Sequence, residues 1–308
     1  MDRIVPKRPI EGVITALVTP FDDRGQLNLG MIKPLVEYNL GHGISGFFVC
    51  GSTGEGILLS PDERRALAAE VIQCNAGRGI VMVHVGTLDT ATACSLAQHA
   101  EEIDADAISA IPPFYYQHSD AAVGKHFRSV AQATPLPTFI YHIPGATGHR
   151  LTADLVQECR QEPNIVGMKF SDNDLYLMRA IMDAAGPDFI TLSGFDQLML
   201  PALTMGVAGA VGNNQNIMPQ MFVQTYNAFH AGHWDEAQEV FGELIRFYSV
   251  LKRYDTSKTT KRVLRMIGLD CGPPRPPNEW ISDEDDRLLH EDLRAAGFLK
   301  MHGIADEP

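Results

Sequence analysis

Residues 138–170, TFIYHIPGATGHRLTADLVQECRQEPNIVGMKF, contain two apolar runs separated by a segment with helical features. The runs Thr138–Tyr141 and Ile165–Lys169 include β-branched and aromatic residues that favour strands. Between them, Thr152–Asp154 supplies an N-cap residue and a first-turn acid, which commonly begin a helix. Apolar strands joined by a helix are typical of a parallel sheet that is covered on its outer face. The stretch therefore predicts a strand–helix–strand unit.

The same order of elements repeats from residue 12 to about residue 213. Eight such units predict a closed (β/α)₈ barrel, the TIM barrel of the α/β class. The alternative is a doubly wound sheet, which usually has a Gly-x-Gly-x-x-Gly turn after its first strand, where this chain has Thr19-Pro20-Phe21-Asp22. The eight apolar runs are Val13–Val18, Gly46–Cys50, Ile80–Val85, Ala107–Ile111, Thr138–Tyr141, Ile165–Lys169, Phe189–Leu192 and Ala208–Val211.

Beyond residue 218 the sequence shows helical spacing only, interrupted by the segment CGPPRPP at residues 271–277. We interpret residues 1–218 as the barrel. Residues 219–308 are interpreted as a C-terminal helical extension that completes the eighth unit and packs on the barrel, so that both parts form a single structural domain. A separate helical domain is the alternative. The predicted helices cover residues 218–231, 234–252, 257–267 and 279–298.

The composition indicates a globular protein with a large core, because 45% of the 308 residues are hydrophobic and 20% are charged. The formal net charge is −13. Nucleic-acid binding requires clustered Lys and Arg residues that neutralise phosphates. Basic residues are scattered here, as in Arg64-Arg65 and Lys261-Arg262. The sequence therefore predicts no nucleic-acid partner.

The cysteines and the N-terminus predict a reduced, cytoplasmic enzyme without a membrane partner. The N-terminal residues Met1–Lys7 contain no apolar core of a signal peptide, and no apolar run approaches the ~18 residues of a membrane span. The five cysteines are dispersed and form no Cys-x-x-Cys pair, which argues against a disulfide framework and a structural zinc site. They are Cys50, Cys74, Cys94, Cys159 and Cys271.

Lys169 is the candidate nucleophile, because active sites of such barrels lie at the C-terminal ends of the strands. Of eight lysines, only Lys169 ends an apolar strand. Alternation along the strand places Ile165, Gly167 and Lys169 on one face. If that face is the barrel interior, Gly167 leaves room beneath the lysine stem. Poor solvation there then favours the free amine, which is a nucleophile. The alternative is a salt-bridged lysine at the barrel rim.

Two further strand ends add candidate site residues. Tyr141 ends the preceding strand, within side-chain reach of Lys169, and a phenol there can relay protons to and from an imine. Its alternative role is simple packing at the barrel mouth. After the second strand, Gly51–Gly56 places the hydroxyls of Ser52 and Thr53 in a glycine-rich turn that suits a carboxylate. The alternative is that the glycines only form the corner between the strand and the next helix.

Other enzyme classes lack their sequence patterns. No His-x-His ends a strand and His-Glu-x-x-His is absent, so the sequence predicts no metal dependence. His84 and His142 are interpreted as hydrogen-bonded core residues. Gly-x-Ser-x-Gly is also missing, which argues against a Ser-His-Asp hydrolase.

Taken together, these motifs resemble the dihydrodipicolinate synthase / N-acetylneuraminate lyase family of pyruvate-dependent class I aldolases. The resemblance runs from about Gly12 to Pro277 and is closer to the N-acetylneuraminate lyase branch. The stretches that carry it, besides Gly51–Glu55, are His84–Gly86, Pro113–Tyr116, Tyr141–Pro144, Lys169–Asp172 with Asp174–Leu175, Gly194–Asp196, Gly209–Gly212 and Gly272–Arg275.

The resemblance implies a role for each matching residue. Lys169 is expected to form a Schiff base with the substrate, Tyr141 to transfer protons, and Tyr115 to reach the site of a neighbouring subunit. Apart from the covalent imine on Lys169, no cofactor is implied. The family resemblance also implies a homotetramer, assembled as a dimer of dimers. The expected substrate-binding residues are Ser52, Thr53, Val211, Ser171, Gly194, Asp196, Gln197 and Asn213.

The chain departs from both branches of the family at the substrate end of the site. Ala146 stands where the synthases have an arginine for the semialdehyde carboxylate. Gln197 and Asn213 stand where the lyases usually have glutamate and serine, while Asp196 and Ser171 match.

The predicted function is therefore reversible cleavage of a hydroxylated 2-oxo acid into pyruvate and an aldehyde. The alternatives within the family are a 4-hydroxy-tetrahydrodipicolinate synthase and a 2-oxo-3-deoxy sugar acid aldolase or dehydratase. Outside it, a non-catalytic 2-oxo acid sensor is disfavoured by the presence of both Lys169 and Tyr141.

Overall fold

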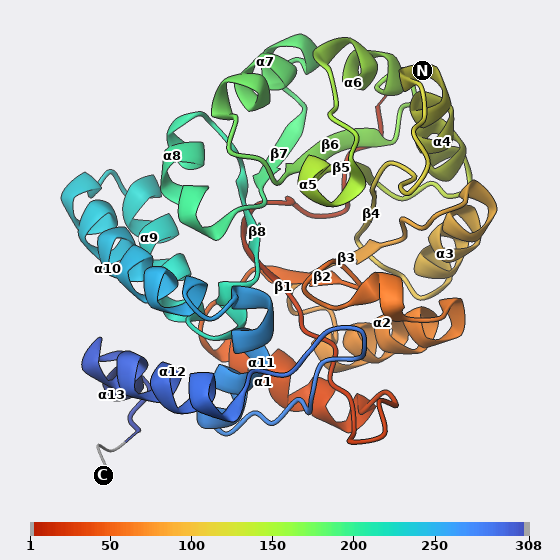
Figure 1. Ribbon diagram of the computed structural model, residues 1–308. Helices are drawn as coiled ribbons and strands as arrows, with labels where there is room; N and C mark the ends of the chain where they lie inside the picture. Colours follow the sequence, from red (N-terminus) through yellow and green to blue (C-terminus); the bar gives the residue numbers. More distant parts are fainter. Residues whose placement is uncertain (1–2, 305–308) are drawn as a thin grey trace.

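The computed structural model describes residues 3–304 and contains a closed barrel of eight parallel strands (Figure 1). Strands pair in chain order, and β8 closes on β1. The predicted (β/α)₈ barrel is thereby confirmed, and each strand begins and ends within two residues of the predicted run. The strands are β1 (Gly12–Ala16), β2 (Gly46–Val49), β3 (Ile80–His84), β4 (Ala107–Ala110), β5 (Thr138–His142), β6 (Ile165–Phe170), β7 (Ile190–Ser193) and β8 (Gly209–Gly212).

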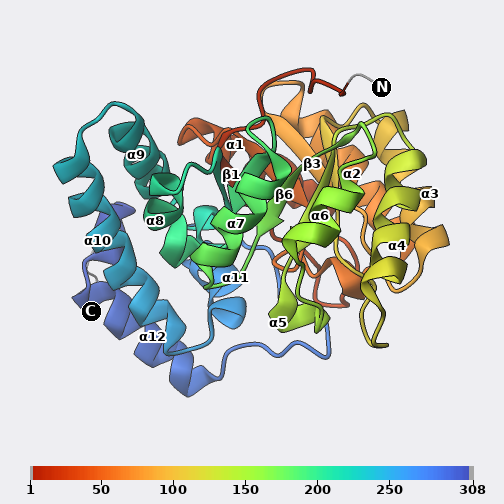
Figure 2. The same cartoon turned by 90° about the horizontal axis from the view of Figure 1, so that it is seen from above.

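Helices surround the barrel on its outside (Figures 1 and 2). Short 3₁₀ turns lie at Leu29–Met31, Gly56–Leu58, Asp196–Leu198 and Asn214–Asn216. The helices of the barrel units are α1 (Ile32–Gly41), α2 (Pro61–Asn75), α3 (Thr90–Glu102), α4 (Asp120–Gln132), α5 (Pro144–Thr147), α6 (Ala153–Cys159), α7 (Leu175–Ala185), α8 (Met199–Thr204) and α9 (Pro219–His230). They are followed by α10 (Trp234–Lys252), α11 (Thr256–Met266), α12 (Asp283–Ala295) and α13 (Phe298–Met301).

Side chains at the helix starts satisfy backbone groups that the helix itself leaves without partners. Ser60 begins α2 with a capping box: its hydroxyl accepts from the Glu63 N–H (3.2 Å), and the Glu63 carboxylate accepts from the Ser60 N–H (2.8 Å). Thr152 caps α6 in the predicted way. In the segment before α7, Asp174 is the capping residue and accepts from the Leu177 N–H at 2.8 Å.

The barrel has two hydrophobic layers. One fills the interior and includes Phe48, Phe139, Leu192 and Val211. The other lies between the strands and the surrounding helices, and it also takes in residues of the C-terminal helices such as Leu251. Alternation of side chains along each strand separates the two layers.

One prediction about β6 is wrong: Ile165 does not share a face with Lys169. The pairing runs from Thr138 opposite Ile165 to Phe139 opposite Gly167, so Val166 is an extra residue in β6. As a result, the side chain of Ile165 points into the outer hydrophobic layer and that of Val166 points into the barrel interior. Gly167 and Lys169 keep the expected direction. The space at Gly167 accommodates the ring of Phe139, which lies 2.5 Å from where a Cβ atom would be.

The C-terminal helices lie against one side of the barrel, where α10 packs along α9 (Figures 1 and 2). The predicted helix 279–298 is wrong at both ends. Its first helical residue is Asp283, because Ser282 caps α12 by accepting from the Asp285 N–H at 3.1 Å. It ends at Ala295, and Gly297 adopts φ 83° before α13 begins. The ends of the two predicted parts of the chain, residues 1–2 and 305–308, lie outside the described residues.

Within residues 3–304, no helix has both the length and the apolar character that crossing a membrane requires. The same residues contain no group of three or more His, Cys, Asp or Glu side chains placed to hold a metal ion.

Gly167→Ala is expected to lower the free energy of unfolding by about 2–3 kcal/mol, as is typical of overpacked cores. The added Cβ would lie 2.2 Å from the Ile190 carbonyl oxygen as well as against Phe139, and the β7 backbone cannot retreat within a closed barrel. Urea unfolding measures the change. Gly242→Ala is the control, because Gly242 lies in α10 with nothing within 4 Å and alanine there should add about 0.5–1 kcal/mol. Equal stability of Gly167→Ala and the parent chain would contradict this prediction.

Candidate active site

A cavity of about 340 Å³ opens at the C-terminal ends of the strands. Ten of the eleven predicted site residues line it, and only Tyr115 does not. It is also lined by residues that were not among the predicted site residues, namely Ala16, Ile143, Asn173, Phe195, Gly212, Asn214 and Tyr248. The predicted residues in the cavity are Ser52, Thr53, Tyr141, Lys169, Ser171, Gly194, Asp196, Gln197, Val211 and Asn213.

Lys169 is a buried lysine, with 3% of its surface exposed. Its ammonium nitrogen lies 4.1 Å from the centre of the Phe48 ring and 4.3 Å from the centre of the Tyr141 ring. No residue of the described chain forms an ion pair with it, so the alternative of a salt-bridged rim lysine does not describe the observed geometry. A lysine amine in such a cavity is placed to act as a nucleophile toward a carbonyl carbon.

Tyr141 stands opposite Lys169 in the β5–β6 pairing. Its ring meets the edges of Phe48 and His84, with ring centres 5.7 and 5.8 Å away. His84 is buried and its Nδ1 lies 3.1 Å from the Cys50 carbonyl oxygen. Burial, reinforced by the charge of Arg64, lowers the pKa of His84 well below its usual value, so this ring is neutral at pH 7. The interpretation of His84 as a core residue agrees with this placement beneath Tyr141.

The loop Gly51–Gly56 carries Ser52 and Thr53 into the cavity. Its backbone is tightly wound: a Cβ atom at Gly56 would lie 1.8 Å from the Cys50 carbonyl oxygen. The Thr19 hydroxyl donates to the Gly54 carbonyl at 2.5 Å and links the loop to the end of the first barrel unit. Glycine at position 56 is therefore needed to form the turn itself, whereas the predicted approach of the loop to a ligand carboxylate stays a prediction.

The opposite end of the cavity is built around Asp196. One of its carboxylate oxygens accepts from the backbone N–H and the side-chain amide of Asn214, both at 2.9 Å. The other oxygen is buried and has no hydrogen-bond partner among the described residues. Burial raises the pKa of Asp196 to about 6. Such a carboxylate is ready to accept a hydrogen bond from a ligand hydroxyl.

Asn214 and Tyr248 were missed by the sequence analysis. Asn214 directly follows the predicted Asn213, and its position after β8 was the signal that could have identified it. Tyr248 lies in α10, and no local pattern in the sequence connects it with the barrel mouth. Asn213 donates from its amide to the Thr260 hydroxyl at 2.7 Å, which ties this end of the cavity to α11.

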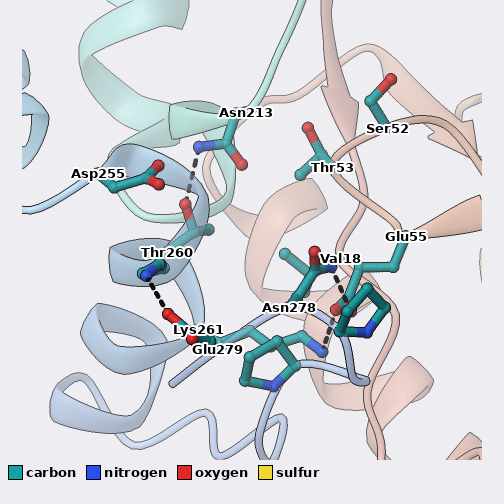
Figure 3. Close-up of a pocket in the computed structure, with 13 residues that line it drawn as sticks. Val18, Ser52, Thr53, Glu55, Asn213, Asp255, Thr260, Lys261, Asn278 and Glu279 are labelled. Atoms are coloured by element: carbon teal, nitrogen blue, oxygen red, sulfur yellow. Dashed lines mark hydrogen bonds and ion pairs between the residues drawn. The ribbon is translucent and has the colours of Figure 1, made fainter. Parts of the chain in front are cut away.

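A second cavity of about 410 Å³ adjoins the first and shares Ser52, Thr53 and Asn213 with it (Figure 3). It is the larger of the two but contains neither Lys169 nor Tyr141. We therefore place the reacting groups in the smaller cavity. The remaining walls of the larger one come mostly from α11 and the segment after it, and include Lys258, Lys261, Asn278 and Glu279.

Tyr115 lies outside both cavities. Its side chain is 84% exposed, and its backbone has φ 79°, a left-handed conformation that is uncommon for a tyrosine. It meets the neighbouring Tyr116 edge to face, with ring centres 5.0 Å apart. Tyr115 does not line the cavity that contains Lys169, and its expected role in the site of another subunit stays a prediction.

An eight-stranded barrel with a buried lysine in the cavity at its mouth has the architecture of a barrel enzyme, and comparison with known proteins identifies the family. The dihydrodipicolinate synthetase family model matches residues 9–296. An N-acetylneuraminate lyase of Rhizobium meliloti is 36% identical over 92% of this chain and 94% of its own. A 4-hydroxy-tetrahydrodipicolinate synthase of Methanopyrus kandleri is 32% identical over 96% of this chain and 99% of its own. The wild-type sialic acid aldolase structure of Ruminococcus gnavus superposes with a TM-score of 0.90 at 28% identity, covering 94% of this chain and 98% of that chain.

The chain belongs to the dihydrodipicolinate synthetase family. The resemblance inferred from the motifs is thereby confirmed. It is an enzyme of the carbon–carbon lyase class, of the pyruvate-dependent aldolase type, and it is similar to the N-acetylneuraminate lyases. The family's synthases are also among its relatives.

Because Asp196 is buried, we expect it to make the free energy of unfolding decrease as the pH rises. Its pKa is about 6 in the folded chain against an ordinary 3.8, so the unfolded chain releases this proton first as pH rises. The contribution of Asp196 to the free energy of unfolding therefore falls between pH 4 and pH 6, by on the order of 3 kcal/mol. Asp196→Asn removes this pH-dependent contribution. In urea unfolding from pH 4 to 7, the free energy of unfolding of the variant should rise relative to that of the parent chain as the pH increases. The same pH dependence in both proteins would contradict the prediction.

Proposed function

We propose that this enzyme reversibly cleaves a hydroxylated 2-oxo acid to pyruvate and an aldehyde through a Schiff base on Lys169. The observation that carries the proposal is a buried lysine that lines the cavity, forms no ion pair with a described residue and lies opposite a tyrosine in the strand register. Ser52 and Thr53 line the same cavity. They are far from Tyr141 and Lys169 in the sequence, and closure of the barrel brings the four residues together.

The first step joins the enzyme to its substrate. The neutral amine of Lys169 attacks the 2-oxo carbon, and loss of water from the resulting carbinolamine gives an imine. Protonation of the imine nitrogen makes it an electron sink. The faces of the Phe48 and Tyr141 rings, which lie within 4.3 Å of the lysine nitrogen, favour a positive charge at that position. Ser52 and Thr53 hold the carboxylate by hydrogen bonds and so orient the 2-oxo group toward the amine.

Bond cleavage follows when Tyr141, as a general base, removes the proton from the C4 hydroxyl. The C3–C4 bond then breaks, its electrons move toward the iminium nitrogen, and an aldehyde and an enamine result. Protonation of the enamine carbon regenerates an imine, and water releases pyruvate and the free amine. The imine itself stores the electrons, so we propose that neither a metal nor an organic cofactor takes part.

The far end of the cavity determines the rest of the substrate. The buried free oxygen of Asp196 and the polar side chains of Gln197 and Asn213 suit a chain of hydroxyl groups. The adjoining 410 Å³ cavity offers room for a longer tail. We therefore propose a 2-oxo-3-deoxy sugar acid as the substrate class, in keeping with relatives that are N-acetylneuraminate lyases.

The alternative reaction is that of a 4-hydroxy-tetrahydrodipicolinate synthase, which consumes pyruvate. It is supported by relatives of that name, at 31–33% identity. Against it stands Ala146, at the position where the resemblance implies an arginine for a second carboxylate. Product analysis separates the two reactions, since one releases pyruvate and the other uses it.

We also propose that the enzyme is a cytoplasmic homotetramer in which Tyr115 completes the site of a neighbouring subunit. The 84% exposure of Tyr115 and its left-handed backbone support this, because a large aromatic residue in a strained loop is suited to an interface. Residues 219–308 are proposed to form a single structural domain with the barrel, supported by the hydrophobic layer that both parts share.

Borohydride reduction in the presence of pyruvate tests the Schiff base. We expect a reduced pyruvyl adduct on Lys169, identified by intact mass and peptide mapping, and pyruvate release from 2-oxo-3-deoxy sugar acids. Lys169→Ala should abolish both, whereas Lys125→Ala, which removes an exposed lysine of α4, should change neither. An adduct on another residue, or full turnover by Lys169→Ala, would refute the mechanism.

Gln197→Glu tests how the far end of the cavity selects the substrate. A carboxylate makes stronger hydrogen bonds to sugar hydroxyls than an amide does, by about 1 kcal/mol or more. We expect the variant to raise kcat/KM for N-acetylneuraminate by roughly fivefold to tenfold relative to shorter 2-oxo-3-deoxy acids. An unchanged ratio between long and short substrates would mean that residue 197 does not contact the tail.

A further inference from the structure

The loop that presents Ser52 and Thr53 is held in place by residues more than 200 positions away in the sequence. At its end, the carboxylate of Glu55 is buried, with 8% of the side chain exposed. It accepts hydrogen bonds from the Lys261 ammonium (2.6 Å), the Arg275 backbone N–H (2.8 Å) and the Asn278 amide (3.2 Å). Figure 3 shows Glu55, Lys261 and Asn278 meeting beneath Thr53. We call Glu55, Lys261, Arg275 and Asn278 the C-terminal clasp.

The ion pair at the centre of the clasp is almost fully buried. The Lys261 side chain is 5% exposed, and its nitrogen also donates to the Pro273 carbonyl (3.3 Å) and lies 4.3 Å from the centre of the Phe21 ring. Burial lowers the pKa of Lys261, and the charge of Glu55 opposes that effect. Desolvation of two charges offsets much of their attraction, so a buried pair adds little net stability. Fixing a geometry is a better-supported reason for placing it here.

The geometry that the pair fixes is unusual. Glu55 has φ 54°, in the left-handed region that non-glycine residues seldom occupy. The carboxylate is nevertheless held by three donors from one distant segment. The backbone N–H of Glu55 also donates to the Ser52 carbonyl at 3.0 Å. The position of Glu55 therefore constrains the backbone of Ser52, whose side chain lines the cavity.

The Arg275 side chain holds the segment that directly follows the same loop. Its guanidinium makes a two-point ion pair with Glu63, with distances of 2.6 and 2.9 Å, and donates to the Leu58 carbonyl at 3.1 Å. Hydrogen bonds from Arg275, the largest cause, lower the pKa of Glu63 to about 2. Because Glu63 belongs to the capping box of α2, the clasp connects the loop, the helix start and the C-terminal segment.

We infer that Lys261 is a positioning residue for the carboxylate-binding loop: through Glu55 it sets the direction of the Ser52 and Thr53 hydroxyls and thereby the affinity for 2-oxo acids. The inference rests on the proposed function to the extent that these hydroxyls bind the substrate carboxylate. Lys261 touches no reacting atom. Its effect is on substrate binding, and it is separable from the reactivity of Lys169.

Lys261→Met tests the inference, with Arg262→Met as the matched control. Arg262 is the next residue of α11 and forms a partly buried ion pair with Asp286, which has no part in the loop. The measurement is the concentration that gives half-maximal borohydride trapping, for pyruvate and for pyruvamide, which lacks the carboxylate charge. Thermal unfolding of each variant is recorded alongside.

We expect Lys261→Met to raise the half-saturating concentration of pyruvate at least tenfold and that of pyruvamide less than threefold. The maximal trapping rate at saturation should stay within threefold. Arg262→Met should leave both half-saturating concentrations within twofold of the parent value, whatever its melting temperature. Equal effects of Lys261→Met on pyruvate and pyruvamide, or none on pyruvate, would overturn the inference.

The double variant Glu55→Gln, Lys261→Met keeps the test decisive if Lys261→Met fails to fold. It removes both charges, so no unpaired carboxylate is left buried. A folded double variant should still need at least fivefold more pyruvate for half-saturation, because it lacks the ion pair between residues 55 and 261 that holds the loop. Parent-like pyruvate binding in that variant would overturn the inference. If the parent enzyme itself forms no adduct, the proposed Schiff base fails instead, and the two failures are thus distinguishable.

Discussion

The hydrogen-bond register between β5 and β6 is the constraint on which the proposed chemistry depends. It sets Tyr141 directly opposite Lys169, after the extra residue Val166 has shifted the pairing by one position. Without the extra residue, the pairing that starts at Thr138 and Ile165 would set Tyr141 opposite Met168 instead of Lys169. Closure of the barrel then fixes the position of both residues, since each strand is hydrogen-bonded on both sides and cannot slide independently. A glycine beneath the lysine lets the Phe139 ring fill the interior at this level.

Two buried lysines illustrate how the surroundings of an amine decide its role. Lys169 and Lys261 both lie over aromatic rings, 4.1 and 4.3 Å from the nearest ring centre, and both are buried. Lys261 forms an ion pair with the Glu55 carboxylate and takes a structural position beside the loop. Lys169 forms no ion pair with a residue of the described chain and lines the cavity, where the proposed mechanism uses it as a nucleophile.

The site is assembled from loops that converge over the mouth of the barrel. In Figure 2 the segment between α11 and α12 passes the same end of the barrel as α5, the helix that directly follows β5. That segment contacts the turns after β1 and β2 through Arg275, which donates to the Gly25 and Leu58 carbonyls. The C-terminal helices thus do more than cover the eighth unit. They hold the loop that carries Ser52 and Thr53, and through Thr260 they also hold Asn213.

The sequence alone determined the eight strands and the barrel, because strand periodicity and helix caps are local properties of the chain. It also identified Lys169, Tyr141 and the Gly51–Gly56 loop as parts of the chain that border the cavity, because each directly follows or ends a predicted strand. The family followed from the same short motifs. Only the tertiary structure decided which face Ile165 occupies, since an extra residue in a strand depends on its neighbour's register. It likewise decided that Tyr248 borders the cavity and that Lys261 meets Glu55 across 206 positions. Such contacts arise when the barrel closes and the helices pack, and no local pattern records them.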